Sequence, residues 1–349
     1  MIRSETYRNL TAVLLVALPV AAPAHHSLFG YDQEELIEFE GEIVDVFWRN
    51  PHVRISVRVA DESGTERVWD IESSPVNQME RRGVSEDQFT IGDRIHFLGN
   101  PSTRIENNVR PVVVTLAGGQ ALVFEEAIAE EYGLLDDNAA ASAGAALAAA
   151  VASSDATGIF RVWTNRDRHW MSDVRGWWAR DFPLTASARA KFDAWDEETD
   201  DPAKQCIPAG MPEAMLMPFP IEFIDNGDSI TLNIEEWDNS RTIHLNAEHD
   251  PDAPPSHLGY SVGRWEGSTL IVETKDVDYG FFNEQGIPQS DALEVVERFT
   301  ISENDTKLDW TAVVTDPETF EEPIVMPEFH WDWIPTQELK SYNCIVDEG

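Results

Sequence analysis

Hydrophobic and polar residues alternate in short runs from residue 36 onward, which is the period of β-strands with one buried face. The clearest runs of the first third cover residues 36–48, 53–59, 67–71, 94–98 and 110–116, and a segment with helical spacing lies at 75–82. Three strands, one helix and two further strands is the order of an OB-type barrel. The pattern predicts an OB-like β-barrel over residues 25–117.

A second β-rich region begins at residue 158. Its short strands are expected at residues 158–163, 221–224, 230–235, 241–245, 260–265, 269–274, 293–301 and 307–314. Only residues 184–195 have clear helical spacing there, after Pro183. Closely spaced strands without intervening helices are typical of an antiparallel barrel or sandwich. Residues 158–349 are therefore expected to form such a domain, with a lipocalin-like closed barrel preferred, and the whole chain is expected to be all-β.

The two regions are separated by residues 118–157. After a short acidic piece this stretch becomes alanine-rich, from Ala139 to Ser154. Such a composition without a wide apolar face is typical of a linker, part of which can be helical.

The first 24 residues have the pattern of a secretory signal peptide. Arg3 and Arg8 precede the apolar run 10–20, and Ala22 and Ala24 provide an A-x-A cleavage site. Cleavage after Ala24 would leave a mature chain of about 325 residues in the periplasm or outside the cell. No later run is long and apolar enough for an integral membrane segment.

The excess of acidic residues makes some classes of binding partner unfavourable. The chain carries 64 acidic and 25 basic residues, for a net charge of −39. Nucleic-acid binding needs a basic surface, so it is not expected here, and anionic membrane surfaces are disfavoured as well. The simplest interpretation is a solvated acidic surface.

Cys206 and Cys344 are the only cysteines. An exported protein folds in an oxidising compartment, and neither cysteine belongs to a C-x-x-C pattern. We therefore expect one disulfide between them. It would close a loop of 138 residues, worth on the order of 5 kcal/mol in the chain-entropy view.

Several short motifs together resemble families of secreted bacterial proteins of unknown function. In the first region they are A-H-H-S (24–27), a strand beginning at Gly41, W-x-N-P-H (48–52) and G-D-x-I (92–95). In the second they are D-P-x-x-x-C-x-P-x-G-x-P (201–212), R-x-I (241–243), G-x-S-x-G-R-W-E-G (259–267), S-D-A-L-x-V-V-E-R-F (290–299) and T-D-P (315–317). Gln289 stands where the related group usually has histidine, and Asn246-Ala247 where it tends to have Asp-Gly. The resemblance implies export but no particular activity.

The first candidate site consists of His25, His26 and His52. After cleavage His25 would carry a free α-amine, and its amine and imidazole together can chelate one ion. His26 or His52, which follows the strand break at Pro51, could add a second imidazole. Such nitrogen ligands suit Cu(II), so the sequence predicts an exported, copper-binding protein. The alternative is that the two terminal histidines bind nothing in particular and that His52 caps a turn.

The second candidate site consists of Arg241, His244, His257 and Glu266. Polar side chains of these types at the mouth of a barrel could orient the polar group of a small, partly apolar molecule, or supply an acid and a base. The alternative is an ordinary solvated loop. Nearby, Trp163, Trp170, Trp177 and Trp178 are expected to fill a core rather than to line a ligand site.

Overall fold

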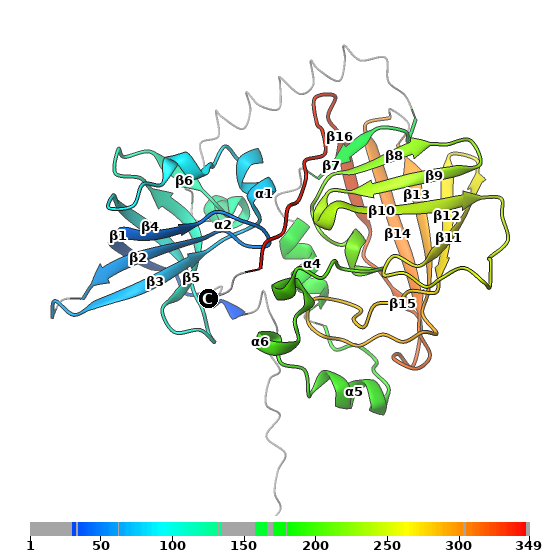
Figure 1. The fold of residues 1–349 in the computed structure, drawn as a ribbon, viewed down its shortest axis with the longest axis horizontal. Helices are drawn as coiled ribbons and strands as arrows, with labels where there is room; N and C mark the ends of the chain where they lie inside the picture. Colours follow the sequence, from blue (N-terminus) through cyan, green and yellow to red (C-terminus); the bar gives the residue numbers. More distant parts are fainter. Residues whose placement is uncertain are drawn as a thin grey trace, which may run out of the picture.

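The computed structural model describes residues 30–346, apart from 33, 62, 132, 134–157, 166–169, 179 and 303–304. The expected signal peptide and most of the expected linker, including its alanine-rich part, lie outside the described residues. Two β-barrels stand side by side, and the C-terminal part of the chain runs between them (Figure 1).

The first barrel has the strand order of an OB-fold. Its strands are β1 (Ile37–Phe47), β2 (Arg54–Ala60), β3 (Glu66–Glu72), β4 (Arg94–Pro101) and β5 (Asn108–Thr115). They pair in the order β3-β2-β1-β4-β5, and a parallel pairing between β3 and β5 closes the sheet. The short α1 (Val76–Arg81) connects β3 with β4, and the 3-10 helix η2 (Glu86–Gln88) follows it. The predicted OB-like barrel is confirmed.

This first domain continues beyond the expected boundary at residue 117. Strand β6 (Ala121–Val123) pairs with β5, and α2 (Glu126–Glu131) follows. Phe124 is fully buried in the first hydrophobic core, and Glu125 is paired with Arg110. The first barrel therefore extends into the range expected as linker, because Leu122 and Phe124 are both buried in its core and β6 adds to its sheet.

The second barrel is closed by nine strands. They are β7 (Val162–Thr164), β8 (Ile221–Asp225), β9 (Ser229–Ile234), β10 (Asn239–Leu245), β11 (Tyr260–Glu266), β12 (Thr269–Lys275), β13 (Glu294–Ile301), β14 (Lys307–Thr315) and β16 (Phe329–Trp333). The pairing of β13 with β14 closes the sheet, so the domain is a barrel and not a sandwich. The two-residue strand β15 (Ile324–Val325) pairs with β14 outside the closed barrel. One pair, β10 with β11, is parallel, because a long loop carries the chain back across the barrel between them.

Short helices accompany the second barrel. They are α4 (Trp170–Trp178), α5 (Ala186–Phe192), α6 (Glu197–Asp200), and the 3-10 helices η3 (Pro202–Gln205), η4 (Glu213–Met215) and η5 (Glu236–Asp238). The sequence predicted only the helix near α5, which begins after its cap, Thr185. None of the helices in the described ranges is long and apolar enough to cross a membrane.

The interior of the second barrel is filled by side chains. Trp163, Trp310 and Trp331 are completely buried in it, and Trp170 stacks on Phe329 with ring centroids 4.4 Å apart. Trp178 is also buried in this core, and Trp177 packs against it. The tryptophans at the start of this domain therefore serve the core, as the sequence indicated.

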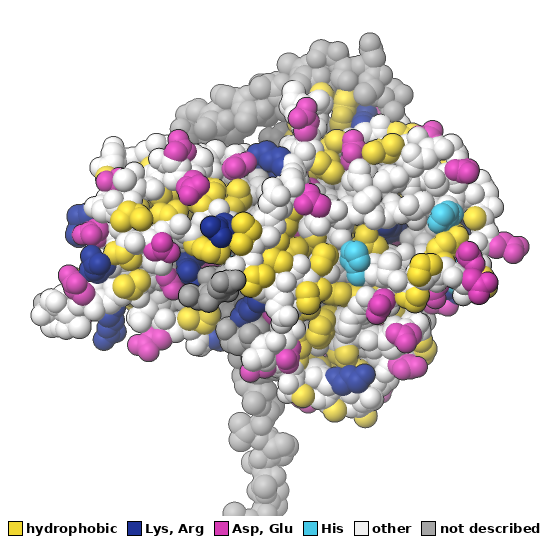
Figure 2. All heavy atoms as spheres, in the orientation of Figure 1, with side chains coloured by type: hydrophobic (Ala, Val, Ile, Leu, Met, Phe, Trp, Pro, Cys, Tyr) yellow, Lys and Arg dark blue, Asp and Glu magenta, His cyan; other side chains and the backbone are white. Residues whose placement is uncertain are grey.

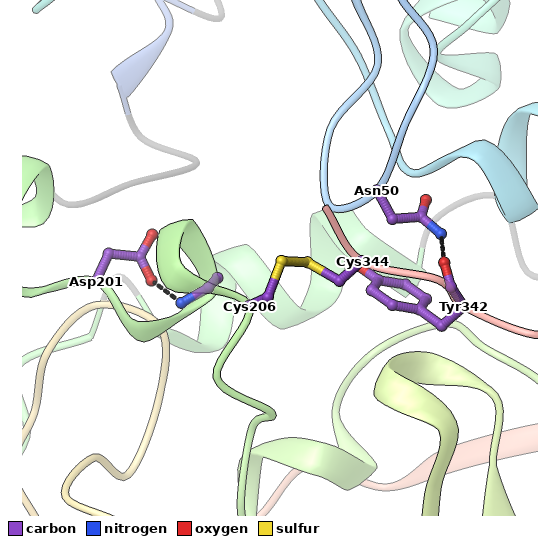
Figure 3. Close-up of a disulfide and its surroundings, with 6 residues drawn as sticks. Asn50, Asp201, Cys206, Tyr342 and Cys344 are labelled. Carbon is purple, nitrogen blue, oxygen red and sulfur yellow. Dashed lines mark hydrogen bonds between the residues drawn. A yellow bond between two sulfur atoms is a disulfide. The ribbon is translucent and has the colours of Figure 1, made fainter. Parts of the chain in front are cut away.

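The C-terminal tail after β16 joins the two barrels. The backbone of Asn50, three residues after β1, forms a parallel bridge with Cys344, and Ile345 N donates to Asn50 O at 3.0 Å. Cys344 is in turn bonded to Cys206 of the second domain, which confirms the predicted disulfide (Figure 3). The tail is thus fixed on one side by hydrogen bonds and on the other by a covalent bond.

A buried ion pair also crosses between the domains. The Glu235 side chain is completely buried, and it receives a bidentate contact from Arg81 of α1. Asn77 Nδ2 and Lys340 N donate to the same carboxylate at 3.0 and 2.8 Å. Glu235 is therefore shared by the first domain, the second domain and the tail.

The substitution Arg81→Met is expected to destabilise the protein. It leaves the buried Glu235 carboxylate without its guanidinium, and breaking a buried pair from one side costs about 3 kcal/mol or more. Chemical denaturation measures this loss. The control, Arg58→Met, removes an exposed pair with Glu42 and should cost less than about 1 kcal/mol. Equal effects of the two substitutions would contradict the role assigned to Glu235.

Candidate functional site

A cavity of about 280 Å³ lies between the two domains. On the first-domain side its wall includes Pro51 and His52, and on the second-domain side it includes residues of the 201–212 segment. Two motifs that lie about 150 residues apart in the sequence therefore meet at one place. Hydrophobic side chains also gather along the seam between the barrels (Figure 2).

Asn50 positions the first of these motifs. It is almost completely buried, and its Oδ1 accepts from Val76 N at 2.7 Å. Its Nδ2 donates to Asn77 Oδ1 and to the carbonyl oxygen of Tyr342 in the tail (Figure 3). The amide of Asn50 thus holds α1 and the tail together, and it places the next two residues, Pro51 and His52, on the cavity wall.

His52 is paired with Glu72. Its Nδ1 lies 2.7 Å from Glu72 Oε1, and its side chain is 55% exposed. Desolvation lowers the pKa of His52, but the hydrogen bond and charge of Glu72 outweigh it, so that this pKa is raised. Desolvation likewise opposes ionisation of Glu72, yet the bond to His52 and the contact from Asn108 Nδ2 lower the pKa of Glu72 to about 2. The two form an ion pair when His52 is protonated.

The 201–212 segment forms much of the opposite wall. Asp201 Oδ1 accepts from Ala203 N at 2.9 Å and begins η3, which ends at Cys206 in a left-handed conformation (φ 54°) (Figure 3). At Gly210 a Cβ would lie 2.6 Å from the side chain of Tyr279, so only glycine lets that ring pack here. This close approach explains the glycine of the motif.

Two carboxyl groups are buried in this wall. Glu213, on η4, and Glu236, on η5, are 4% and 7% exposed. Burial, with further contributions from the charges of Glu284 and other acids, raises the pKa of Glu213 well above its usual range and that of Glu236 to about 8. Tyr279 Oη donates to Glu213 Oε2 at 3.3 Å, whereas Oε2 of Glu236 is buried without a hydrogen-bond partner in the described part of the chain.

Aromatic rings surround these carboxyl groups. Trp237 has a left-handed backbone (φ 61°) and its ring lies 4.8 Å from that of Tyr342. Both rings line the cavity, as do Tyr279 and Trp195, and Trp195 packs directly over Gly286. A left-handed conformation at a bulky residue costs about 1–3 kcal/mol and is found mainly at functional sites. The wall therefore combines buried acids with flat apolar surfaces.

Of the predicted metal ligands, His25 and His26 lie outside the described residues, and His52 lines the cavity. Within the described ranges no group of three or more His, Cys, Asp or Glu side chains is placed to hold a metal ion. The predicted copper site therefore remains a prediction.

The structure does not bring together the four residues expected at the mouth of the second barrel, and none of them lines the cavity. Arg241 points into the barrel, where it pairs with the fully buried Glu297 at 2.5 Å. His244 stacks on Tyr260, and Glu266 is exposed beside Arg264. A strand residue alternates between inside and outside, and the sequence alone did not indicate which charged residue would face in.

His257 supports the 201–212 segment through hydrogen bonds. Its Nε2 lies 2.8 Å from Asn239 Oδ1, and Asn239 Nδ2 donates to the carbonyl oxygen of Ala209. Its own carbonyl oxygen accepts from Met211 N at 2.9 Å. His257 thus fixes the 201–212 segment from behind. Gln289, where histidine was expected from the resemblance, donates to the carbonyl oxygens of Met211 and Tyr279 and supports the same wall.

Residues 12–108 match the model of DUF6152, a family of unknown function. The matched range includes the W-x-N-P-H motif and most of the first barrel, so the resemblance of this part of the chain to an uncharacterised family is confirmed. No curated protein matches the chain.

The cavity residues that the sequence did not reveal are Glu213, Glu236, Trp237, Tyr279 and Tyr342. They come from separate loops, and none belongs to a motif with a known chemistry. The available signal was indirect: Asn50-Pro51-His52 and the 201–212 segment were both specific strings outside regular strands. Such strings in loops indicate a shared site more often than a shared core.

The substitution Glu236→Gln is expected to change the pH dependence of stability. The pKa of Glu236 is about 8 in the folded protein and 4.5 when unfolded, so the folded state binds more protons between these values. The stabilisation that this extra proton provides is fully present below pH 4.5. As the pH rises to 8, the free energy of unfolding falls by up to about 1.4 kcal/mol per pH unit. The Gln variant should therefore gain stability relative to the native protein across this range in denaturation measurements. Parallel profiles would contradict the assigned pKa.

Proposed function

We propose that this is an exported binding protein that holds a small, partly apolar molecule in the cavity between its two domains. The observation that carries the proposal is that two sequence motifs from different domains converge on one cavity of about 280 Å³. Small-molecule sites are typically concave and apolar, with a few placed polar groups, and they are frequent at domain interfaces.

The composition of the wall supports a partly apolar ligand. Met217, Phe219 and Phe281 provide apolar surface, and the wall also includes ionisable side chains from both domains. The core of the second barrel is already filled by tryptophan and phenylalanine side chains. A ligand is therefore better accommodated between the barrels than inside the second one. We keep the expected small-molecule ligand and place it in the cavity between the domains.

Export is supported by two features. The first 24 residues have the pattern of a cleavable signal peptide. The Cys206–Cys344 disulfide is of a kind that persists in oxidising compartments such as the periplasm or the extracellular medium.

Filling the cavity is expected to abolish ligand binding. A tryptophan in place of Ala203, which lines the cavity, would occupy the space of the ligand. In a screen of small cationic, neutral and anionic fragments by NMR, compounds that bind the native protein should bind Ala203→Trp at least about tenfold more weakly, or 1.4 kcal/mol. The control, Ala60→Trp, changes an exposed residue at the end of β2 and should leave binding unchanged. If no fragment depends on Ala203, the proposal fails.

We also propose copper binding as a second candidate, favoured by the placement of His52. A carboxylate that bonds one ring nitrogen of a histidine orients the other nitrogen toward a metal, and Glu72 bonds Nδ1 of His52 in this way. Gly30, on the same cavity wall, is five residues from His25. An extended chain of that length reaches about 17 Å, enough for the mature N-terminus to approach His52.

The copper candidate predicts a loss of Cu(II) affinity in two variants of the protein cleaved after Ala24. His52→Ala and an extra residue before His25 should each weaken binding by about tenfold or more in calorimetric titration, because each removes a nitrogen ligand. His96→Ala is the control, since His96 lies on β4 beside Glu38 and outside the cavity. Indifference to both changes would eliminate this candidate.

A further inference from the structure

We propose that the cavity takes an organic ammonium cation, held between the buried carboxyl groups of Glu213 and Glu236 and the aromatic rings beside them. The inference rests on the proposed ligand-binding function and adds the chemical class of the ligand. It is independent of the copper candidate, which depends on the opposite wall.

The first argument is the unpartnered carboxyl group. Oε2 of Glu236 has no hydrogen-bond partner among the described residues, although the residue is more than nine-tenths buried and lines the cavity. A buried polar atom without a partner costs roughly 1–3 kcal/mol, so natural proteins keep few of them. An organic cation in the cavity would supply a compensating charge, and an N–H or hydroxyl group that it carries would supply the missing hydrogen-bond donor.

The second argument is the aromatic surface. The ring centroids of Trp237 and Tyr342 lie 4.8 Å apart, and both rings line the cavity together with Tyr279. Trp237 follows Glu236 in the sequence, and Tyr279 is hydrogen-bonded to Glu213. The faces of such rings attract cations, and the attraction is strongest where water is excluded. Carboxylates combined with aromatic rings form a site for a bulky organic cation rather than for a hydrated inorganic one.

The third argument excludes other ligand classes. Within the described ranges, the acidic side chains of the cavity do not converge on a point that could hold a metal ion. An anion would need an available cation, but Arg110 is already bonded to Glu125 through Nε and Nη2, and His52 is bonded to Glu72. Arg104 and Lys204 also have partners. The wall formed by the second domain is therefore suited to positive charge.

Proton release should accompany binding. The groups that face the site from the second domain are Asp201, Lys204, Glu213, Glu236, Tyr279, Glu284 and Tyr342, and those from the first domain are Tyr31, His52, Glu72, Arg104 and Arg110. The pKa of Glu236 is about 8, so this carboxyl group is largely protonated at neutral pH, and burial raises the pKa of Glu213 as well. A cation favours their ionised forms, and its affinity should rise with pH by up to about tenfold per unit below pH 8.

The test uses three probes of one shape and different charge. They are choline, its uncharged isostere 3,3-dimethylbutan-1-ol, and the anion 3,3-dimethylbutanoate, each titrated into the native protein by NMR or calorimetry at pH 6, 7 and 8. We expect choline to bind at least about tenfold more tightly than the alcohol at pH 8, the anion to bind most weakly, and only the choline affinity to rise with pH.

Two variants connect this preference to the site. Glu236→Gln and Glu213→Gln should each remove most of the preference for choline over the alcohol, and Glu236→Gln should also flatten the pH dependence. Glu248→Gln is the matched control, because it removes one negative charge from an exposed position outside the cavity. Both substitutions in the cavity replace a carboxyl group by an amide of similar size. The probe series on the native protein tests the proposal without them.

Equal binding of choline and the alcohol, or loss of preference in Glu248→Gln alone, would overturn the cation assignment while leaving a small-molecule site in place. Absence of measurable choline binding at millimolar concentration would also overturn it. The broader proposal of ligand binding is decided separately, by the fragment screen with Ala203→Trp.

Discussion

The docking of the C-terminal tail between the two barrels is the interaction on which the rest of the structure depends. The tail is hydrogen-bonded to Asn50 in the first domain, shares the buried Glu235 with Arg81, and is covalently bonded to Cys206 in the second domain. Each barrel has its own core, but the cavity has walls from both. The tail and the Glu235 contacts therefore hold together the two domains that form the walls of the cavity.

The wall of this cavity contains features that destabilise the folded protein. Glu213 and Glu236 are buried near other acids, Oε2 of Glu236 lacks a partner, and Trp237 has a strained backbone. A chain under selection for stability alone would replace such features with apolar residues, since buried polar groups without partners are destabilising. Strongly shifted ionisable groups in a cleft are more often found at functional sites. This cost is the physical reason for placing the function here and not in the filled barrel.

Much of the fold could be predicted from the sequence because it depends on local patterns. The alternation of hydrophobic and polar residues predicted the strands of the first barrel. The expected export and the presence of only two cysteines predicted the Cys206–Cys344 disulfide. The pattern did not show that Arg241 faces inward to Glu297, because burial of a charge depends on a partner 56 residues away. It also missed β16 and the parallel pairing of β10 with β11, which are set by non-local contacts. The cavity could not be predicted for the same reason: Glu236 and His52 lie in different domains, far apart in the sequence, and both line the cavity only in the folded chain.

The central claim is that domain docking creates a site of buried carboxyl groups with raised pKa values, which a cation can ionise. Carbon-13 NMR of glutamate side chains, with Glu213 and Glu236 assigned through their Gln variants, tests it most directly. The account predicts that the Glu236 carboxyl group titrates near pH 8 in the free protein, and that saturating choline lowers its midpoint and that of Glu213. Titration of both groups near the ordinary value of about 4.5, unchanged by choline, would contradict it.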